Sequence, residues 1–560
     1  MKLRCRELIE QGNKLFSKRS GLESRWQNIA DHFFPERADF TRQLDDDDDF
    51  AGHLMSGFPS ICRRDLANQI GGMLRPRGQT WFHPRTPNDK INKDQNAKVW
   101  LDHMGEVMHD WFNDSLSGFS RATKQGDHDF ATFGQCVIQV TKNQNRDFVL
   151  FRDWHLRDVA WAENAEMEID RVHRKQKMEA RNVVRYFGRS NGEIAETVRE
   201  CASREPFKEI PIQHIVVPAD DYDLSKAKNY RGLPFISIYV DMDNEKVLEE
   251  IPVARLGYVI PRWQTVSGSQ YAHCPATVIA IPDARLLQRM TLTLLEAGEK
   301  AVDPPMLAVG ENLQGGINVY AGGVTYVDPE YDERTGEALR ALQLDKSGLQ
   351  WGVDREQRVS EMIMRAFYLN QIQLPEVTGD MTAYETQKRV EEYVRNALPL
   401  FEPMEAEYNA KLCGEAFDVM MELGAFGNKW ELADMMPEIL RGQEVRFTFE
   451  SPIQQAKTRA NSQAFLQSSQ LLAAAMQIDS NARFDFDVRQ ANRDAIEGTG
   501  APANWLLPKE QADKMAKQAS QAEAEKMDDA ETMASLGQGA DVAARAGDAM
   551  SSINQALTGE

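Results

Sequence analysis

The sequence predicts a mainly helical α+β protein whose chain is divided among several lobes. Two amphipathic stretches of about 20 residues, 282–301 and 353–373, flank a glycine-rich module. Residues 134–263 instead hold short runs of Val, Ile and aromatic residues bounded by turn residues, as strands do. A chain of 560 residues is also too long for one hydrophobic core, so about three to four domains are expected.

Helices dominate the first part of the chain. Residues 3–34 have a helical pattern that ends at Phe34-Pro35, and residues 94–114 carry the apolar stripe of a helix packed on a core. That stripe is Trp100, Leu101, Met104, Val107, Met108, Trp111 and Phe112. Between the two helices stand five consecutive aspartates at 45–49. Phe50 and Ser56 replace the Gly and Glu of an EF-hand, so a solvated acidic loop is expected there.

The predicted strands include "QCVIQV", "FVLFRDW", "IPIQHIVV", "PFISIYVD" and "YVIPRW". The stretch "VDMDNEKVLEE" predicts a hairpin that turns near Asp243-Asn244. Helical pieces at 179–204 interrupt the series, which makes this part of the chain α+β.

The two long helices are predicted to be rods of matched length, each about 30 Å long. Pro282 suits the first position of the first rod, and Asp303-Pro304-Pro305 ends it. The second rod closes at Pro375. Its apolar stripe is Val359, Met362, Ile363, Ala366 and Phe367. Matched rods around a compact insert predict a module held away from the main body, with the chain returning alongside itself.

A short loop, "EVTGDM", follows Pro375. Thr382 and Glu385 form a capping box that starts a helix of about 40 residues, which the prolines at 399 and 403 are expected to bend or break. A strand at 444–450 and a helix at 453–475 come next. Past residue 508 the chain has strong helix formers but few large apolar residues, so it needs partners to be stable.

The composition of the chain limits the kinds of function that it can have. The net charge of −21 disfavours tight nonspecific binding of nucleic acid, although it is compatible with a protein that lets nucleic acid slide past. We expect neither a membrane span nor a signal peptide, since no run of about 20 apolar residues occurs. The six cysteines lie far apart in sequence and never as CxxC, so free thiols are expected.

The sequence offers no catalytic or metal motif. It contains no phosphate-binding loop, dinucleotide turn, zinc helix or nucleophile elbow, so we expect no enzyme, no metal site and no cofactor. "GDHDFATFG" places His128 between Asp127 and Asp129, but without a second histidine pair it predicts an ordinary turn before a strand. A structural or mechanical role is therefore favoured.

Five stretches, taken in order, resemble the portal proteins, or head-to-tail connectors, of short-tailed double-stranded DNA bacteriophages. They are "RWQNIADHFFPERADF", "GGMLRPRGQTWFHP", "YVIPRWQTVSGSQYAHCPATVIAIPDARLLQRM", "EKAVDPPML" and "GDMTAYETQKRVEEYVRNALP". The resemblance runs from about residue 20 to residue 450. It departs at Ala272 and His273, where the family commonly has glycine and a small polar residue, and the last hundred or so residues match only in character.

The resemblance implies the phage portal architecture, with wing, stem, clip and crown regions that assemble into a ring, usually a dodecamer. The implied division is 1–275 for the N-terminal wing, 276–303 for the first stem helix, 304–351 for the clip, 352–374 for the second stem helix, 375–381 for the tunnel loop, 382–450 for a long wing helix and returning strand, 451–507 for the crown, and 508–560 for a C-terminal helical barrel or flexible tail.

The implied function is a channel at one capsid vertex for DNA packaging and ejection. The terminase motor would dock on it first and tail adaptors later. The implied partners are further copies of the chain, double-stranded DNA, terminase, a tail adaptor, and the major capsid and scaffolding proteins, with no membrane. The implied location is the portal vertex of the virion, after assembly in the host cytoplasm. The alternatives are another ring-forming virion assembly protein, from the tail or internal core, and, less favoured, a packaging enzyme.

The resemblance also implies roles for particular residues. The tunnel loop would present Val377, Thr378, Gly379, Asp380 and Met381 to the channel, the alternative being an ordinary helix–helix connection. Docking cations in the clip would be Arg334, Arg340 and Lys346, and cations on the second stem helix, facing the lumen or a neighbouring subunit, would be Arg355, Arg358 and Arg365. The alternative for each cation is a salt bridge on the surface or between subunits.

Overall fold

The structure is a computed structural model. It describes part of the chain. The described residues are 5–45, 47–76, 80–92, 94–188, 190–222, 232–308, 339–341, 347–372, 404–426, 437–449, 465, 468–472, 487–498, 512, 514–515 and 517–519. The chain divides into two compact units. The first comprises Met1–Pro87, His103–Met436 and Gly442–Ile453, and the second comprises Asn88–Asp102, Pro437–Arg441 and Gln454–Glu560. Within the described residues, no helix combines the length and apolar character that a membrane crossing requires.

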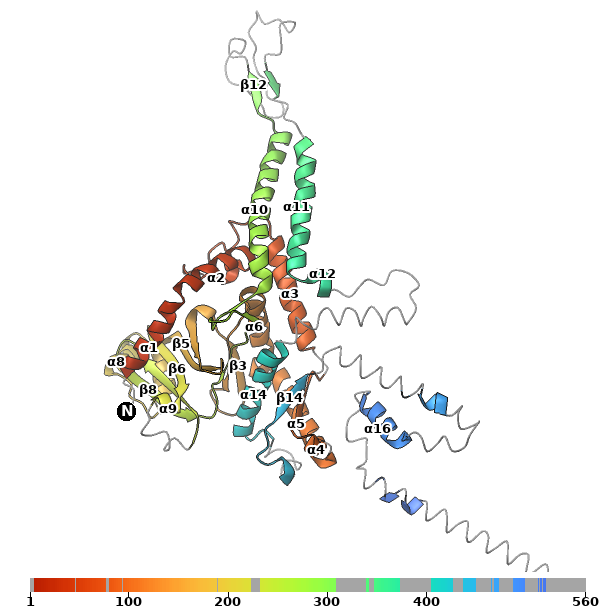
Figure 1. Ribbon diagram of the computed structural model, residues 1–560. Coiled ribbons are helices and arrows are strands. Elements are labelled where there is room, and N and C mark those ends of the chain that lie inside the picture. The colour runs from red at the N-terminus through yellow and green to blue at the C-terminus, as the bar shows by residue number, and fades with distance from the viewer. Residues whose placement is uncertain are drawn as a thin grey trace, which may run out of the picture. The chain divides into compact units, whose positions relative to one another are not determined.

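Two helices, α1 (Cys5–Lys18) and α2 (Ser20–Phe33), occupy the region predicted as one helix (Figure 1). The break falls at Arg19, whose backbone has φ −102° and ψ 8°. The buried Arg19 guanidinium donates hydrogen bonds to the carbonyls of Leu156, at 2.8 Å, and Val159. The interruption therefore serves a contact with residues far along the chain. The predicted end of α2 at Phe34-Pro35 is confirmed, and a 3₁₀ turn, η1 (Pro35–Arg37), follows.

A five-stranded antiparallel sheet has the order β4-β5-β6-β7-β8. Its strands are β4 (Val159–Glu163), β5 (Ile169–Glu179), β6 (Glu209–Pro218), β7 (Phe235–Asp241) and β8 (Lys246–Val253). The predicted hairpin is confirmed as the β7–β8 connection. On β6, Ile215 and Val217 pack toward Leu8 of α1, whereas Ile210 and Ile212 pack toward α7 (Ala180–Phe187) and α8 (Glu196–Arg204) on the opposite face.

A second, three-stranded antiparallel sheet has the order β3-β2-β9. Its strands are β2 (Ile138–Lys142), β3 (Val149–Asp153) and β9 (Tyr258–Val259). Its apolar residues join the largest core, together with residues of α3 (Phe58–Leu74), α6 (Phe119–Phe133) and α14 (Ala410–Glu422). The predicted strand near 444–450 is confirmed as β14 (Arg446–Phe449), which pairs with β1 (Phe82–Arg85). The predicted helix at 94–114 is confirmed as α5 (Gln95–Asn113).

The two predicted rods form an antiparallel helical hairpin, α10 (Pro275–Val302) and α11 (Ser347–Ala366), which lie side by side in Figure 1. The predicted start of the first rod at Pro282 is wrong, because Pro275 takes the first helical turn and Pro282 lies inside the helix. The second rod begins earlier than predicted, and Tyr368, at φ +58°, separates it from α12 (Leu369–Ile372). Between the rods, β12 (Met306–Ala308) pairs antiparallel with β13 (Leu339–Ala341).

The remaining described elements are short or lie in the second unit. They are α4 (Asp89–Asn92), η2 (Ser115–Ser117), η3 (Leu156–Asp158), α9 (Ala219–Tyr222), β10 (Gln264–Thr265), β11 (Ala272–His273), the π-helical turn η6 (Glu405–Asn409), η8 (Glu438–Leu440) and α16 (Val488–Gly498). Residues 309–338, 373–403 and 450–464 lie outside the described residues. Most of the predicted clip, the tunnel loop and the helix begun by Thr382 therefore remain predictions.

Candidate functional site

The helical hairpin holds together through small and apolar side chains on its inner faces. Gly352 of α11 lies against Leu294 of α10, where an added Cβ would come within 2.6 Å of the leucine Cδ2 atom. Thr291 donates a hydrogen bond from Oγ1 to Glu356 Oε1 at 2.6 Å. Toward the base, the buried core residues on the two helices are Ala280, Ala284 and Leu287 of α10 and Val359 and Ile363 of α11. The hairpin therefore has a fixed axial register.

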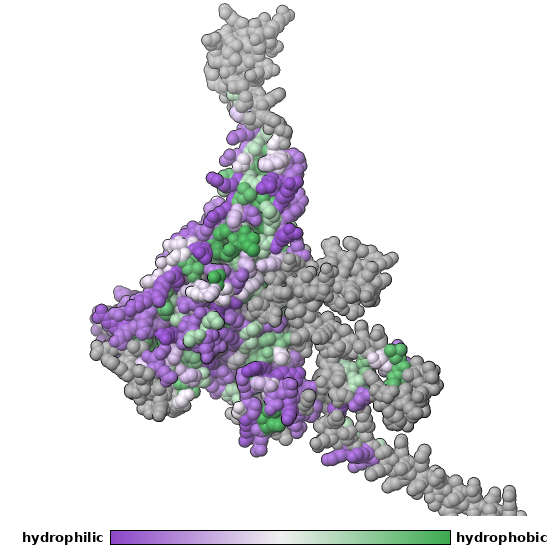
Figure 2. Space-filling model, in the orientation of Figure 1, coloured by the Kyte–Doolittle hydropathy of each residue, from purple (hydrophilic) through white to green (hydrophobic). Residues whose placement is uncertain are grey.

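The outer faces of the hairpin expose large apolar side chains between charged ones. Figure 2 shows hydrophobic and hydrophilic residues side by side on the face of the hairpin turned to the viewer. On α10 they are Val278, Ile279, Leu286, Leu292, Leu295 and Val302, and on α11 they are Trp351, Val353 and Met362. Trp351 is 71% exposed and Leu295 is 53% exposed. Met362, which the sequence pattern placed in the buried stripe, is 43% exposed, so that part of the prediction is wrong. Val359, Ile363 and Phe367 of the same stripe are fully buried as predicted.

One face of α11 carries a stripe in which residues follow one another at alternating steps of four and three. The stripe is Trp351, Arg355, Arg358, Met362 and Arg365. Such spacing keeps side chains on one side of a helix. All three arginines are exposed, and none forms an ion pair with another described residue. This face is thus both cationic and apolar, a combination that suits contact with a macromolecule.

The hairpin is anchored to the rest of the first unit along one side of α10. The Gln288 side chain accepts hydrogen bonds from the backbone N–H groups of Met55 (2.7 Å) and Ser56 (2.9 Å), and donates one to the Ser56 carbonyl at 2.7 Å. At its base, Thr277 donates to the Thr132 carbonyl at 2.9 Å. These bonds hold α10 against the segment before α3 and the end of α6.

Gly134 permits the close approach of α6 to the start of α10. Its φ is +75°, and a Cβ there would overlap the backbone of His273 and Cys274. Left-handed geometry combined with a backbone contact leaves glycine as the residue that fits.

Beneath the hairpin, Asp127, His128 and Asp129 each meet a different arginine. Asp127 pairs with Arg75, His128 Nδ1 lies 2.5 Å from Arg63 Nη1, and Asp129 accepts from Arg37 at 2.6 and 3.1 Å. The prediction of a turn at this motif is wrong, because all three residues lie on α6. The motif is polar because Asp127, His128 and Asp129 pair with arginines at three successive positions around α6.

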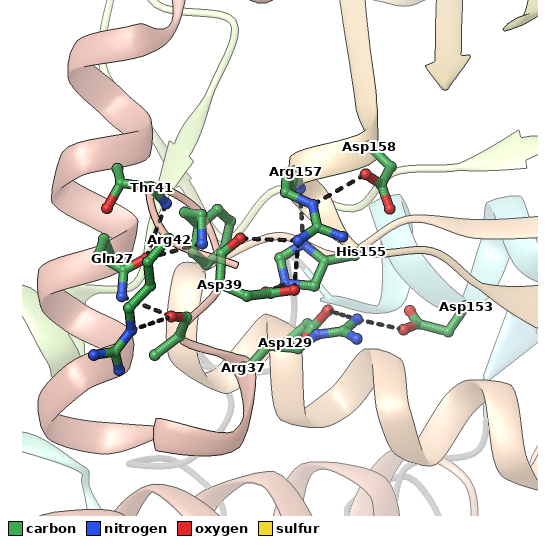
Figure 3. Close-up of polar contacts among 12 residues, drawn as sticks. Gln27, Arg37, Asp39, Thr41, Arg42, Asp129, Asp153, His155, Arg157 and Asp158 are labelled. Carbon is green, nitrogen blue, oxygen red and sulfur yellow. Dashed lines mark hydrogen bonds and ion pairs between the residues drawn. The ribbon is translucent and has the colours of Figure 1, made fainter. Parts of the chain in front are cut away.

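The electrostatics of this cluster follow from burial. Burial and the charge of Arg63 lower the pKa of His128 to about 4, so the ring is neutral at pH 7. Burial and the nearby Asp129 raise the pKa of Asp153 well above its ordinary value. Arg37 lies 2.9 Å from Asp153 and bridges it to Asp129 (Figure 3). Within the described residues, no group of His, Cys, Asp and Glu side chains could hold a metal ion.

A second ion-pair group secures the chain after η1. Asp39 Oδ2 accepts from Arg157 Nη1 at 2.6 Å, and Asp39 Oδ1 lies 2.6 Å from His155 Nε2 (Figure 3). Although burial opposes it, His155 and Arg157 lower the pKa of Asp39. Arg42 pairs with Asp31 at 3.2 Å on the same segment. These ion pairs tie the segment after η1 to α2 and to the residues at and before η3.

The segment 373–403 leaves the described chain after α12 and returns at η6. Both ends are fixed, since Leu369 is 4% exposed and Met404 is 1% exposed in the main core. Arg75 donates to Asn409 Oδ1 at 2.7 Å, and Arg262 donates to Glu407 at 3.1 and 3.2 Å. The described residues on either side of 373–403 are therefore held in the main core.

The structure describes some of the predicted site residues and leaves others out. Arg340 lies on β13 opposite Leu307. Arg334 and Lys346, together with Val377, Thr378, Gly379, Asp380 and Met381, lie outside the described residues. Sequence reasoning missed Arg285 and Arg289, which are exposed on α10 without an ion pair to another described residue. Arg285 and Arg289 are four residues apart, which places them on one polar face of a helix, and this spacing was the sequence signal that could have found them.

Comparison with known proteins finds relatives over nearly the whole chain. The family model described as "Bacteriophage head to tail connecting protein" matches residues 6–507. The "Portal protein" of Salmonella phage epsilon15 is 22% identical over 92% of this chain and 92% of that protein. The "Probable portal protein" of Bordetella phage BPP-1 is 24% identical over 98% of this chain and 97% of that protein. The chain belongs to the bacteriophage head-to-tail connecting, or portal, protein family, whose members are structural and non-enzymatic components of the virion.

Proposed function

We propose that copies of this chain close into a ring at one capsid vertex and form the channel through which double-stranded DNA is packaged and ejected. The observation that carries the proposal is the hairpin of α10 and α11. It buries its inner faces but exposes Trp351, Leu295 and other apolar side chains on its outer faces. Contact with neighbouring copies would remove this surface from water, which stabilises by about 25 cal/mol per Å² of apolar area buried.

The two outer faces of the hairpin differ, so a contact between them is heterologous. A heterologous contact closes into a ring when its repeated rotation returns to the first copy, and otherwise gives an open filament. In such a ring, Arg355, Arg358 and Arg365 would recur once per copy, at the lumen or between subunits. The net charge of −21 reduces adhesion of DNA to the wall, while a few cations guide it.

The segment between β12 and β13 would be the clip, where terminase docks and a tail adaptor later replaces it. Arg334, Arg340 and Lys346 are the proposed docking cations. Residues 375–381 would be the tunnel loop, and residues 1–275, 451–507 and 508–560 the wing, the crown and the barrel or tail. The proposed location is the portal vertex, reached after assembly with capsid and scaffolding proteins in the host cytoplasm.

The test is capsid assembly with and without this chain. Co-production with the phage capsid and scaffolding proteins should give shells with a ring at a single vertex, and those shells should package DNA when terminase and ATP are added. Deleting residues 377–381 should leave the rings in place and impair packaging or retention of DNA. Rings found only on tails, or shells that package equally well without the chain, would contradict the proposal and favour a tail component.

A further inference from the structure

Two rows of side chains, mostly polar, face each other where the three-stranded and five-stranded sheets of the first unit meet. Strand register defines the rows. They are Arg152, Gln139 and Tyr258 across β3-β2-β9, and Arg174, His214 and Tyr239 across β5-β6-β7. Arg174 Nε donates to the Tyr258 hydroxyl at 2.9 Å, and His214 Nδ1 lies 2.5 Å from the same oxygen. A polar layer thus joins the sheets.

Trp154 lies in this layer in contact with two guanidinium groups. Its ring centroid is 4.0 Å from the Arg152 guanidinium carbon and 3.7 Å from that of Arg174. The indole N–H donates to Gln139 Oε1 at 2.9 Å, which fixes the ring. Arg174 is 2% exposed, whereas Arg152 is exposed. The tryptophan therefore holds a surface cation next to a buried one.

Neither arginine has a carboxylate partner among the described residues. Arg174 bonds to neutral groups, the Tyr258 hydroxyl and Gln176 Oε1 at 2.7 Å. By contrast, Arg75 and Arg262, which are also buried, each pair with an acidic side chain. The chain contains 86 acidic and 65 basic residues, so a shortage of acids does not explain the difference. A buried cation without a counter-charge is costly and favours an anion nearby.

The surrounding charges add to the positive potential. Burial, and then the charges of Arg174 and Arg121, lower the pKa of Arg152, although Tyr186 and Tyr239 oppose the effect. Burial and Arg174 also lower the pKa of His214 well below its ordinary value, so that ring is neutral.

The acid closest in register is already occupied. Glu249, opposite Tyr239 in the sheet, accepts from Ser190 at 2.8 Å and lies 3.9 Å from Arg146.

We propose that the exposed Arg152, held against Trp154 with the buried Arg174 guanidinium also in contact with that ring, forms a binding site for a phosphate group. The guanidinium fork matches phosphate oxygens, and stacking on Trp154 holds Arg152 ready for that contact. A phosphate would relieve the repulsion between the arginines. It can come from a DNA backbone or from free phosphate, which offer the same chemistry. This site is independent of the ring proposed above.

The experiment compares the full-length protein with Arg152→Gln and with Arg199→Gln, a control that removes an exposed α8 arginine lacking a described ion pair. Thermal unfolding in inorganic phosphate, against chloride at equal ionic strength, gives the phosphate affinity, and anisotropy of a labelled DNA duplex gives the DNA affinity. Unfolding in chloride checks that each variant folds.

Arg152→Gln should weaken phosphate binding about tenfold, and Arg199→Gln should not. If Arg152→Gln also lowers the affinity for the DNA duplex, the phosphate that binds comes from DNA. If it lowers only the affinity for inorganic phosphate, the ligand is the free ion. Equal phosphate affinities in the wild type and Arg152→Gln, or no phosphate effect beyond that of chloride, would overturn the proposal. Neither measurement depends on whether the chain forms a ring.

Discussion

Thr291 of α10 donates a hydrogen bond to Glu356 of α11 across the hairpin at 2.6 Å. This bond and the contact of Leu294 with Gly352 set the axial register of the two helices. The proposed stem is therefore a preformed rod within one subunit and does not depend on a neighbouring copy for its pairing.

Replacing Thr291 with Val keeps the shape of the side chain and removes this bond, so it should lower the free energy of unfolding by about 1 kcal/mol. Thr293→Val is the matched control, because its hydroxyl bonds only to the Arg289 carbonyl of its own helix at 2.9 Å. Chemical denaturation of both variants checks this. Equal losses would mean that the contact between the helices contributes nothing specific.

Gly134→Ala should be strongly destabilising, by about 3 kcal/mol or more, because it combines a left-handed backbone with a clash against His273 and Cys274. Gly268→Ala separates the two causes. Gly268 has φ +87° with nothing within 4 Å of an added Cβ, so only the conformational cost of about 1 to 2 kcal/mol is expected. Thermal unfolding measures both, and similar losses would refute the close approach.

Removing Arg75 should leave Asp127 buried without a partner. We expect Arg75→Met to cost about 3 to 5 kcal/mol, as for other broken buried pairs. Arg6→Met breaks the exposed pair with Glu10, whose distance is 3.2 Å, and should cost at most about 1 kcal/mol. Unfolding in urea distinguishes these outcomes, and comparable costs would show that the buried pair is not a structural anchor.

The mixed α+β class and the presence of two long helices were predictable because they rest on local patterns, namely helical periodicity, prolines and strand-like runs. The predicted match in length is wrong, because α10 has 28 residues and α11 has 20. The resemblance to portal proteins is confirmed by the family match. The sequence pattern missed β5, whose residues Arg171, Arg174, Lys175 and Lys177 look like a solvated segment. Arg174 is buried through bonds to Gln176 within its own strand and to Tyr258 on β9. Contacts between distant segments leave no local signal.

The same reason explains the errors at Arg19, Pro282 and the Asp127 motif. The break at Arg19 depends on carbonyls more than a hundred residues away. Pro275 and Pro282 are equally compatible with a helix start in isolation, and the packing of Ala276 and Ala280 in the core favours the earlier one. The arginine partners of α6 come from α3, η1 and the residue after α3, so no spacing rule could assign them.

Glu415 should make stability depend on pH. Burial raises the pKa of Glu415 to about 7 from 4.5, although Arg255, 3.5 Å away, opposes the shift. Because the native state holds the proton more tightly than the unfolded chain, stability falls as the pH rises from about 4.5 to about 7. The side chain is 16% exposed, and the shift corresponds to a loss of up to about 3 kcal/mol. Glu415→Gln should flatten this dependence in urea titrations, and an unchanged slope would contradict the assignment.

The most direct test of the proposed ring is the mass of the purified chain by light scattering, with negative-stain images of the same sample. A ring of about twelve copies of the 63.5 kDa chain, with a central hole, is expected. Replacing Trp351, Met362 and Leu295 by Ser should shift the mass toward the monomer without unfolding the chain, because these side chains are exposed within one subunit. A wild-type protein that remains a 63.5 kDa monomer at every concentration, or forms open filaments, would contradict the account.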